Sequence, residues 1–272
     1  MLGQKLVCMD FDQTLVKGHF HSFLQKTKKQ PPNENTAGVQ ILQNDGTFLR
    51  KDPQCKSWVK VSCVAGKGAK FEQMIEFLVD PNKGPKNPNE MAQTIKAIID
   101  NGHKLAIVSF TLYPEVIIPS LHTILNSLIK DDERTQSYLA QIAVIGGFPS
   151  DGDPDNSPLG KEEHIFAAME SYGIRNLENV LLVDDSKKNL DKAVSRTKMR
   201  AENMVLVPAS KEADHNSYIP KIVNFIEENL NEVERKMLER PPSPVIPKYT
   251  QEVLSARSSE SVVDSREKSF SP

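Results

Sequence analysis

The sequence predicts an α/β protein with a doubly wound parallel sheet. Two observations indicate this fold: the apolar runs are continuous, as in strands buried on both faces, and helical patterns separate them. Five runs are predicted strands, at Lys5–Met9, Lys104–Val108, Ile142–Ile145, Val180–Val183 and Met204–Val207. Because strand and helix alternate over residues 88–240, we expect a parallel sheet with helices on both of its faces.

The predicted helices have recognisable ends. Asn87-Pro88-Asn89-Glu90 combines an N-cap residue, a proline at the first helical position and a glutamate at the third, so we expect a helix from there to Asn101-Gly102. Gly173 directly follows the predicted helix Lys161–Tyr172. Apolar spacing predicts three more helices, at Tyr113–Ile129, at Lys187–Thr197 and from Pro220 through Met237.

Residues 17–86 interrupt the alternation after the first strand. They contain alternating stretches on both sides of Asn44-Asp45-Gly46, a hairpin turn signal, and another alternating stretch at Ser57–Ser62. A short helix is predicted at Phe71–Val79. We therefore expect a small inserted cap that contains a β element of its own.

The chain is thus predicted to have a core of residues 1–16 and 87–240, the cap at 17–86 and a C-terminal tail at 241–272. The tail holds eight serines, begins with a proline-rich stretch and lacks an apolar period, so we expect it to be disordered. One expectation is a protein partner that binds this tail. Its composition also resembles the C-terminal signals of effectors that bacteria secrete into host cells.

Composition and charge exclude several classes of function. Of the 272 residues, 38% are hydrophobic and 26% are charged, and the net charge of −2 gives no general attraction to nucleic acid or to an anionic membrane. The most apolar stretch, Val116–Ile129, is shorter than the ~20 residues of a membrane span, and no signal-peptide pattern is present. Cys8, Cys55 and Cys63 are too few for a disulfide framework. We therefore expect a cytoplasmic protein with reduced thiols, without a nucleic-acid partner or a membrane span; delivery into a host cell is the alternative location.

Acidic side chains follow two of the predicted strands. Asp10 and Asp12 come after the first, and Asp184 and Asp185 come after Val180–Val183. The carboxyl ends of neighbouring parallel strands lie at one edge of a sheet, where α/β proteins bind ligands. We therefore expect these four carboxylates to lie close together.

A cluster of four acids needs positive charge. Two carboxylates ~4 Å apart repel each other by about 4 kcal/mol at an effective dielectric constant of 20. Lys161, at the start of a helix, and Ser109, at the end of a strand, are expected at the same edge. Because the cluster offers oxygen ligands without His or Cys, it favours a hard cation, and Mg²⁺ suits a site that also takes phosphate oxygens.

Taken in order, these residues resemble a known set of motifs. Asp10-Phe11-Asp12-Gln13-Thr14-Leu15, Ser109, Lys161 and Asp184-Asp185 are similar to the four motifs of the haloacid dehalogenase superfamily. That superfamily consists mainly of Mg²⁺-dependent phosphatases and other phosphoryl-transfer enzymes. The resemblance covers residues 3–208, with residues 17–86 in the place of a cap.

The resemblance implies catalytic roles. Asp10 would be the nucleophile that forms an aspartyl-phosphate, and Asp12 the general acid and then the general base. Ser109 and the amide of Phe110 would bind a phosphoryl oxygen of the substrate. Lys161 would neutralise charge on the nucleophile and on the transferred group.

The resemblance also implies a set of metal ligands. Asp10, the backbone carbonyl of Asp12, and Asp185 would hold Mg²⁺. Asp184 and Asn189 would act through water or by supporting the ligands. Asn189 stands where many members have an aspartate, so its role stays open.

Two positions leave alternatives. Lys187 or Lys188 can replace Lys161 in its role, since each also lies near the start of a predicted helix. Gln13 stands where many members of the superfamily have glycine. That position varies, so no functional difference is predicted from it.

Other candidate motifs have plainer interpretations. We expect His19 and His21 to be surface residues, although a role toward substrate stays open because they follow the first motif closely. Gly66-Lys67-Gly68 lacks the remaining residues of a phosphate-binding loop. The acidic segment 151–162 is similar to a calcium loop, but two prolines interrupt it and its sixth position is not glycine.

These observations predict a Mg²⁺-dependent phosphomonoester hydrolase that acts on a phosphorylated substrate, a small molecule rather than a phosphoprotein. A phosphoacceptor receiver domain uses similar residues, but its lysine comes last, whereas here Lys161 precedes Asp184. Two further alternatives are phosphoryl transfer to an acceptor other than water and an interaction protein that keeps the fold without turnover.

Overall fold

The computed structural model describes residues 4–19, 38–51, 57–61, 75–80, 82–111, 114–148, 160–208 and 218–227. All of them belong to one compact unit, Met1–Asn231. The second unit, Glu232–Pro272, contains the predicted tail and lies outside the described residues, so the expected disorder of the tail stays a prediction.

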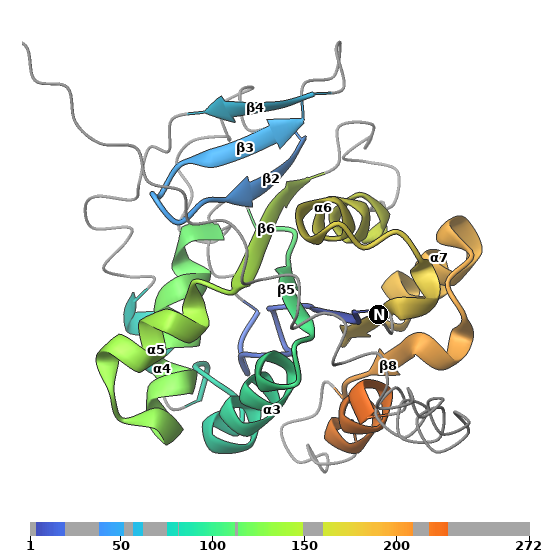
Figure 1. Ribbon diagram of the computed structural model, residues 1–272. Helices are drawn as coiled ribbons and strands as arrows, with labels where there is room; N and C mark the ends of the chain where they lie inside the picture. Colours follow the sequence, from blue (N-terminus) through green and yellow to red (C-terminus); the bar gives the residue numbers. More distant parts are fainter. Residues whose placement is uncertain are drawn as a thin grey trace, which may run out of the picture. The chain divides into compact units, whose positions relative to one another are not determined.

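The described residues form an α/β fold around a mixed sheet (Figure 1). Its eight described strands are β1 (Leu6–Met9), β2 (Gly38–Leu42), β3 (Phe48–Lys51), β4 (Trp58–Val61), β5 (Lys104–Val108), β6 (Ile142–Phe148), β7 (Val180–Asp184) and β8 (Met204–Leu206). They lie in the order β4-β3-β2-β6-β5-β1-β7-β8. The five strands from β6 to β8 in this order are parallel, which confirms a mostly parallel core.

The helices also lie close to their predicted positions. They are α3 (Pro88–Asp100), α4 (Ile117–Ile129), α5 (Asp132–Leu139), α6 (Glu162–Tyr172) and α7 (Lys187–Thr197), with helical segments at 75–79 and 219–227 and 3₁₀ turns at Pro114–Val116, Leu177–Asn179 and Ala201–Asn203. Within the described part of the chain, no helix is long and apolar enough to cross a membrane.

One local difference from the predictions has a physical cause. α5 is absent from the predictions because it is largely polar, and Thr135, Tyr138 and Leu139 are its buried side chains.

The predicted start of α3 is confirmed. Asn87 occupies the N-cap, Pro88 follows it at the first helical position, and Glu90 lies in the first turn. Asn87 has a left-handed backbone (φ 36°), and its side chain makes no capping hydrogen bond.

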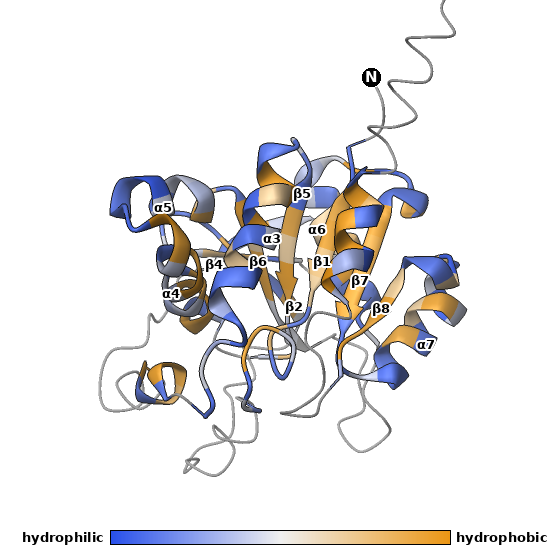
Figure 2. Cartoon of the chain, turned by 90° about the horizontal axis from the view of Figure 1, so that it is seen from below, coloured by the Kyte–Doolittle hydropathy of each residue, from blue (hydrophilic) through white to orange (hydrophobic). Residues whose placement is uncertain are grey.

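The side chains of β1 alternate between two apolar cores, one on each face of the sheet. Val7 and Met9 belong to a core that includes residues of α3, α4 and α5, whereas Leu6 and Cys8 belong to a core that includes residues of α6 and α7. Figure 2 shows the central strands as hydrophobic along most of their length, with hydrophilic residues on the helices around them. This burial on both faces explains why the predicted strands are continuous apolar runs.

The predicted β element of the insertion is present and continues the main sheet. β2 and β3 pair around the predicted turn, where Gly46 has the positive φ (77°) that glycine tolerates. β3 pairs with β4, and β2 pairs antiparallel with β6, the outermost strand of the parallel core (Figure 1). The assignment of residues 17–86 as a cap stays a prediction.

Candidate active site

The carboxyl ends of neighbouring strands bring the predicted site residues together. β1 pairs in parallel with β5 on one side and with β7 on the other. As the chain leaves β1, the N–H of Asp10 donates to the Val183 carbonyl at 2.8 Å, and the N–H of Ser109 donates to the Ile145 carbonyl at 2.9 Å. Asp10, Ser109 and Asp184 therefore lie at the same edge of the sheet, as predicted.

Lys161 lies at the N-terminus of α6 and reaches Asp10. Its ammonium group is 2.6 Å from Oδ1 of Asp10 and donates to the Val108 carbonyl at 2.8 Å. The two side chains are 1% and 8% exposed, so water screens neither charge and each depends on the other for compensation. The alternative lysines, Lys187 and Lys188, are exposed on α7.

Three carboxylates form a compact group. Oxygen atoms of Asp10, Asp184 and Asp185 lie within 4.8 Å of one another. Burial, and then the charge of Asp10, raise the pKa of Asp184 to about 7 and the pKa of Asp185 to about 6. A bound cation would offset both causes, so the group can hold a metal ion, and its carboxylate oxygens are the ligands that Mg²⁺ prefers.

The start of α7 supports Asp184. Nδ2 of Asn189 lies 3.1 and 3.2 Å from the two carboxylate oxygens of Asp184, and the N–H of Ser186 donates to one of them at 2.8 Å. Ser186 is the N-cap of α7, and its side chain accepts from the N–H of Asn189. Asp184 is fully buried, whereas Asp185 is partly exposed, so Asp185 has the freer carboxylate.

Asp12 pairs with His19 beside the first motif. Its Oδ2 is 3.5 Å from Nδ1 of His19, and the two side chains are 17% and 48% exposed. A half-exposed His19 agrees with the expected surface position, and its contact with Asp12 leaves it beside the site. Asp12, like Asp185, is thus a predicted site residue with access to solvent.

Phe110 packs against the ammonium group of Lys161, and His164 packs against Phe110. The ammonium group of Lys161 lies 4.3 Å from the centre of the Phe110 ring, and His164 meets that ring edge-on at 5.2 Å. His164 is fully buried, its Nε2 is 3.0 Å from the Gly147 carbonyl, and burial followed by the charge of Lys161 lowers its pKa to about 3. The imidazole of His164 is therefore neutral and adds no second positive charge beside Lys161 and Asp10.

Two residues of this region were missed at the sequence level. His164 lies three residues after Lys161, a spacing that places both on one face of a helix and was the available signal. Lys86 is 2% exposed, and its ammonium group donates to the Gln13 carbonyl beside the first motif. No local pattern marks Lys86, because its contact crosses the whole insertion.

Several predictions lie outside the described residues. They concern His21, Cys55, Cys63, Gly66-Lys67-Gly68, the acidic segment through residue 159, and residues 71–74 and 228–237 of two predicted helices. Cys8 is a buried free thiol, as expected for a reduced cysteine.

Comparisons with known proteins add no family to this geometry. No protein-family model matches the chain, and no curated protein sequence matches it. The resemblance to the haloacid dehalogenase superfamily therefore stays a prediction from the motifs.

Proposed function

We propose that the protein is a Mg²⁺-dependent phosphomonoester hydrolase with Asp10 as its nucleophile. The observation that carries the proposal is the buried pair of Asp10 and Lys161 beside the carboxylates of Asp184 and Asp185. A nucleophilic carboxylate, a fixed cation and a second place for a cation are what in-line transfer of a phosphoryl group requires.

The strand order supports the same reading. Numbered along the chain, the five parallel strands β6-β5-β1-β7-β8 lie in the order 3-2-1-4-5, which is typical of doubly wound sheets. Such sheets bind their ligands where the strand order reverses, which is between β1 and β7. Asp10 follows the first of these strands and Asp184 ends the second.

Asp10 begins the proposed reaction. Because its Oδ1 is bound to Lys161, Oδ2 is the oxygen that attacks phosphorus. The new bond joins Oδ2 to phosphorus as the bond from phosphorus to the alcohol oxygen breaks, which leaves an aspartyl-phosphate. Lys161 keeps its proton and stabilises the charge that moves onto the phosphoryl oxygens.

Asp12 moves the protons. Its protonated carboxyl group donates to the departing alcohol oxygen, and the resulting carboxylate then accepts a proton from the water that attacks the aspartyl-phosphate. As the oxygen of this water bonds to phosphorus, the bond from phosphorus to Oδ2 of Asp10 breaks, so inorganic phosphate leaves and both aspartates return to their starting states. The partial exposure of Asp12 supports this role because both proton partners arrive from solvent.

The remaining residues are proposed to bind the phosphoryl group of the substrate and the metal ion. Ser109 and the amide of Phe110 are proposed to donate to a phosphoryl oxygen, since Ser109 directly follows β5, the strand next to β1. Asp10, Asp185 and the backbone carbonyl of Asp12 are proposed to hold Mg²⁺, with Asp184 and Asn189 supporting them. When bound, Mg²⁺ supplies positive charge to the phosphoryl oxygens.

The test is hydrolysis of p-nitrophenyl phosphate by the purified full chain, with Mg²⁺ or with excess chelator. We expect turnover that requires Mg²⁺, and a loss of at least about 10³-fold in Asp10→Asn. Asp191→Asn is the matched control, because Asp191 pairs with Lys187 on the exposed face of α7. Turnover that survives chelation, or an Asp10→Asn rate like the control's, contradicts the proposal.

Substrate class needs a separate measurement. A screen of sugar phosphates, nucleotides, lipid head-group phosphates and phosphopeptides compares kcat/KM across chemical classes. We expect a small phosphorylated molecule to give the highest value.

A further inference from the structure

The two ends of the insertion are tied together directly beside the first motif. The N–H of Lys17 donates to the Gly84 carbonyl at 2.9 Å, and the N–H of Lys86 donates to the Leu15 carbonyl at 2.8 Å. An isolated antiparallel bridge joins the residues between these contacts. We call the paired segments 15–18 and 83–86 the stem. Whatever moves the stem also moves the loop that carries Asp10 and Asp12.

Lys86 extends this connection from the backbone to a side chain. It is 2% exposed, and its ammonium group donates to the Gln13 carbonyl. Gln13 directly follows Asp12 and has a left-handed backbone (φ 57°), which is costly for a residue with a Cβ atom. A cation bound to the Gln13 carbonyl favours this left-handed conformation. The conformation of Gln13 in turn affects where the preceding residue, Asp12, is held.

Lys86 also places a buried positive charge beside the first motif, because its ammonium group binds the Gln13 carbonyl one residue after Asp12. Burial lowers the pKa of Lys86, and the charge of Asp185 acts in the opposite direction. The same interaction lowers the pKa of Asp185 against the larger effects of burial and Asp10. Lys161 thus compensates Asp10 on one side of the group, and Lys86 acts on Asp185 from the stem.

We propose that Lys86 is a positioning residue of the acidic site: it holds the Gln13 turn so that Asp12 is correctly placed. This inference rests on the proposed function. A positioning role predicts a loss of kcat with KM little changed, and recovery when an arginine keeps a cation at this position. A merely structural role predicts a loss of stability without that split between kcat and KM.

The experiment compares Lys86→Met with the wild-type full chain in the hydrolysis of p-nitrophenyl phosphate at saturating Mg²⁺. We expect kcat to be about 10- to 100-fold lower with KM little changed, because Asp12 is displaced.

The matched control is Lys83→Met. Lys83 lies in the same stem, but its side chain is 51% exposed and its ammonium group pairs with Asp80 at 2.9 Å. This substitution removes an equal charge from the stem without touching Gln13, so we expect kcat within twofold of wild type. Lys86→Arg, which keeps a cation at this position, should restore kcat to within about threefold of wild type.

Each outcome decides the inference. A lower kcat with KM little changed in Lys86→Met, restored in Lys86→Arg, supports it, whereas a wild-type kcat in a folded Lys86→Met overturns it. If circular dichroism shows Lys86→Met to be unfolded, Lys86→Gln repeats the removal of charge with a polar side chain and is judged by the same measurement. Failure of the proposed function has a different signature, because Asp10→Asn then retains turnover.

Discussion

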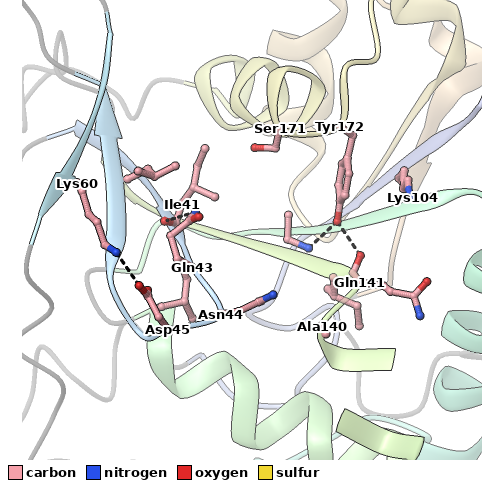
Figure 3. A pocket seen from close by; sticks show the side chains of 14 residues that line it. Ile41, Gln43, Asn44, Asp45, Lys60, Lys104, Ala140, Gln141, Ser171 and Tyr172 are labelled. Atoms are coloured by element: carbon pink, nitrogen blue, oxygen red, sulfur yellow. Dashed lines mark hydrogen bonds and ion pairs between the residues drawn. The ribbon is translucent and has the colours of Figure 1, made fainter. Parts of the chain in front are cut away.

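The two edges of the sheet each carry a lysine–aspartate pair at the same distance. At the carboxyl edge, Lys161 and Asp10 are 2.6 Å apart with side chains 1% and 8% exposed. Near the amino edge, Lys60 and Asp45 are also 2.6 Å apart, but their side chains are 59% and 53% exposed (Figure 3). Water screens the second pair and not the first, so equal distances carry very different free energies.

The surroundings of the two lysine–aspartate pairs also differ. At the amino ends of β5 and β6, a cavity of about 690 Å³ opens beside Asp45 and Lys60. A neutral, half-buried side chain joins the elements here. The hydroxyl of Tyr172 accepts from the N–H of Ala143 and lies 2.9 Å from the Gln141 carbonyl (Figure 3). It is also 2.7 Å from the Leu105 carbonyl, so its single proton is available to either of these two acceptors. The Tyr172 hydroxyl at this edge links strands and a helix, whereas the polar groups at the carboxyl edge bring buried charges together.

The largest expected effect comes from breaking the buried pair. Lys161→Met leaves the Asp10 carboxylate buried without its partner, so we expect unfolding free energy to fall by about 3–5 kcal/mol in the absence of Mg²⁺. Turnover should fall by about 10²–10³-fold. Urea unfolding with chelator and hydrolysis of an aryl phosphate measure the two effects.

Lys187→Met is the control for this change. Lys187 is 73% exposed and pairs with Asp191, also at 2.6 Å. We expect little change in stability or rate. Equal losses in the two variants would remove the distinction between the buried and the exposed pair.

A second, intermediate effect tests a half-buried acid away from the site. Glu115 lines a cavity of about 490 Å³ that adjoins the turn after β2, and burial raises its pKa to about 7. Because the folded-state pKa exceeds the unfolded-state value, the stabilisation is complete below the ordinary pKa of glutamate and is lost as the pH rises through 7. Glu115→Gln should therefore gain stability relative to wild type between pH 5 and pH 8, by at most about 3 kcal/mol.

Urea unfolding at the two pH values measures this gain, and the comparison with wild type cancels the other titrating groups. Glu133→Gln, on the exposed side of α5, is the control and should show no such gain. A pH-independent difference for Glu115→Gln would mean that Glu115 titrates normally in the folded chain.

The smallest effect is expected for the exposed pair. Asp45→Asn and Lys60→Met, alone and together, should leave Tm within the scatter of repeat scans, because water already screens both charges. A double-mutant cycle by differential scanning fluorimetry measures the coupling. A coupling free energy comparable to that of Asp10 with Lys161 would contradict the proposed difference between the exposed and the buried pair.

Local patterns were sufficient for much of the fold and for the core of the candidate site. The predicted and observed helix Lys187–Thr197 coincide because Ser186 caps its start and Lys198 takes a left-handed backbone at its end. Asp10, Ser109 and Asp184 were predictable because each lies where a buried strand ends, and the polarity changes sharply there. Lys161 was predictable as the cation at the start of a helix, although not uniquely.

The remaining features depend on contacts between distant segments. The antiparallel pairing of β2 with β6 has no local signal, because the apolar patterns of these two strands are equally compatible with other strand orders. The hydrogen bond from Lys86 to the Gln13 carbonyl joins residues 73 positions apart across the insertion. His164 belongs to the site through its ring contact with Phe110, a residue 54 positions earlier in the chain.

The amino-acid sequence alone was enough to specify the strands, most of the helices and the acidic residues at the strand ends, because apolar periodicity and polar boundaries are local properties. Only the tertiary structure decided which lysine meets Asp10, which residues support Asp184 and how the insertion joins the sheet. These depend on strand order and on burial, which set the distance between charges and the water that remains between them. Lys161 and Lys187 are both lysines near helix starts, and their surroundings in the folded chain make one a buried partner and the other a surface residue.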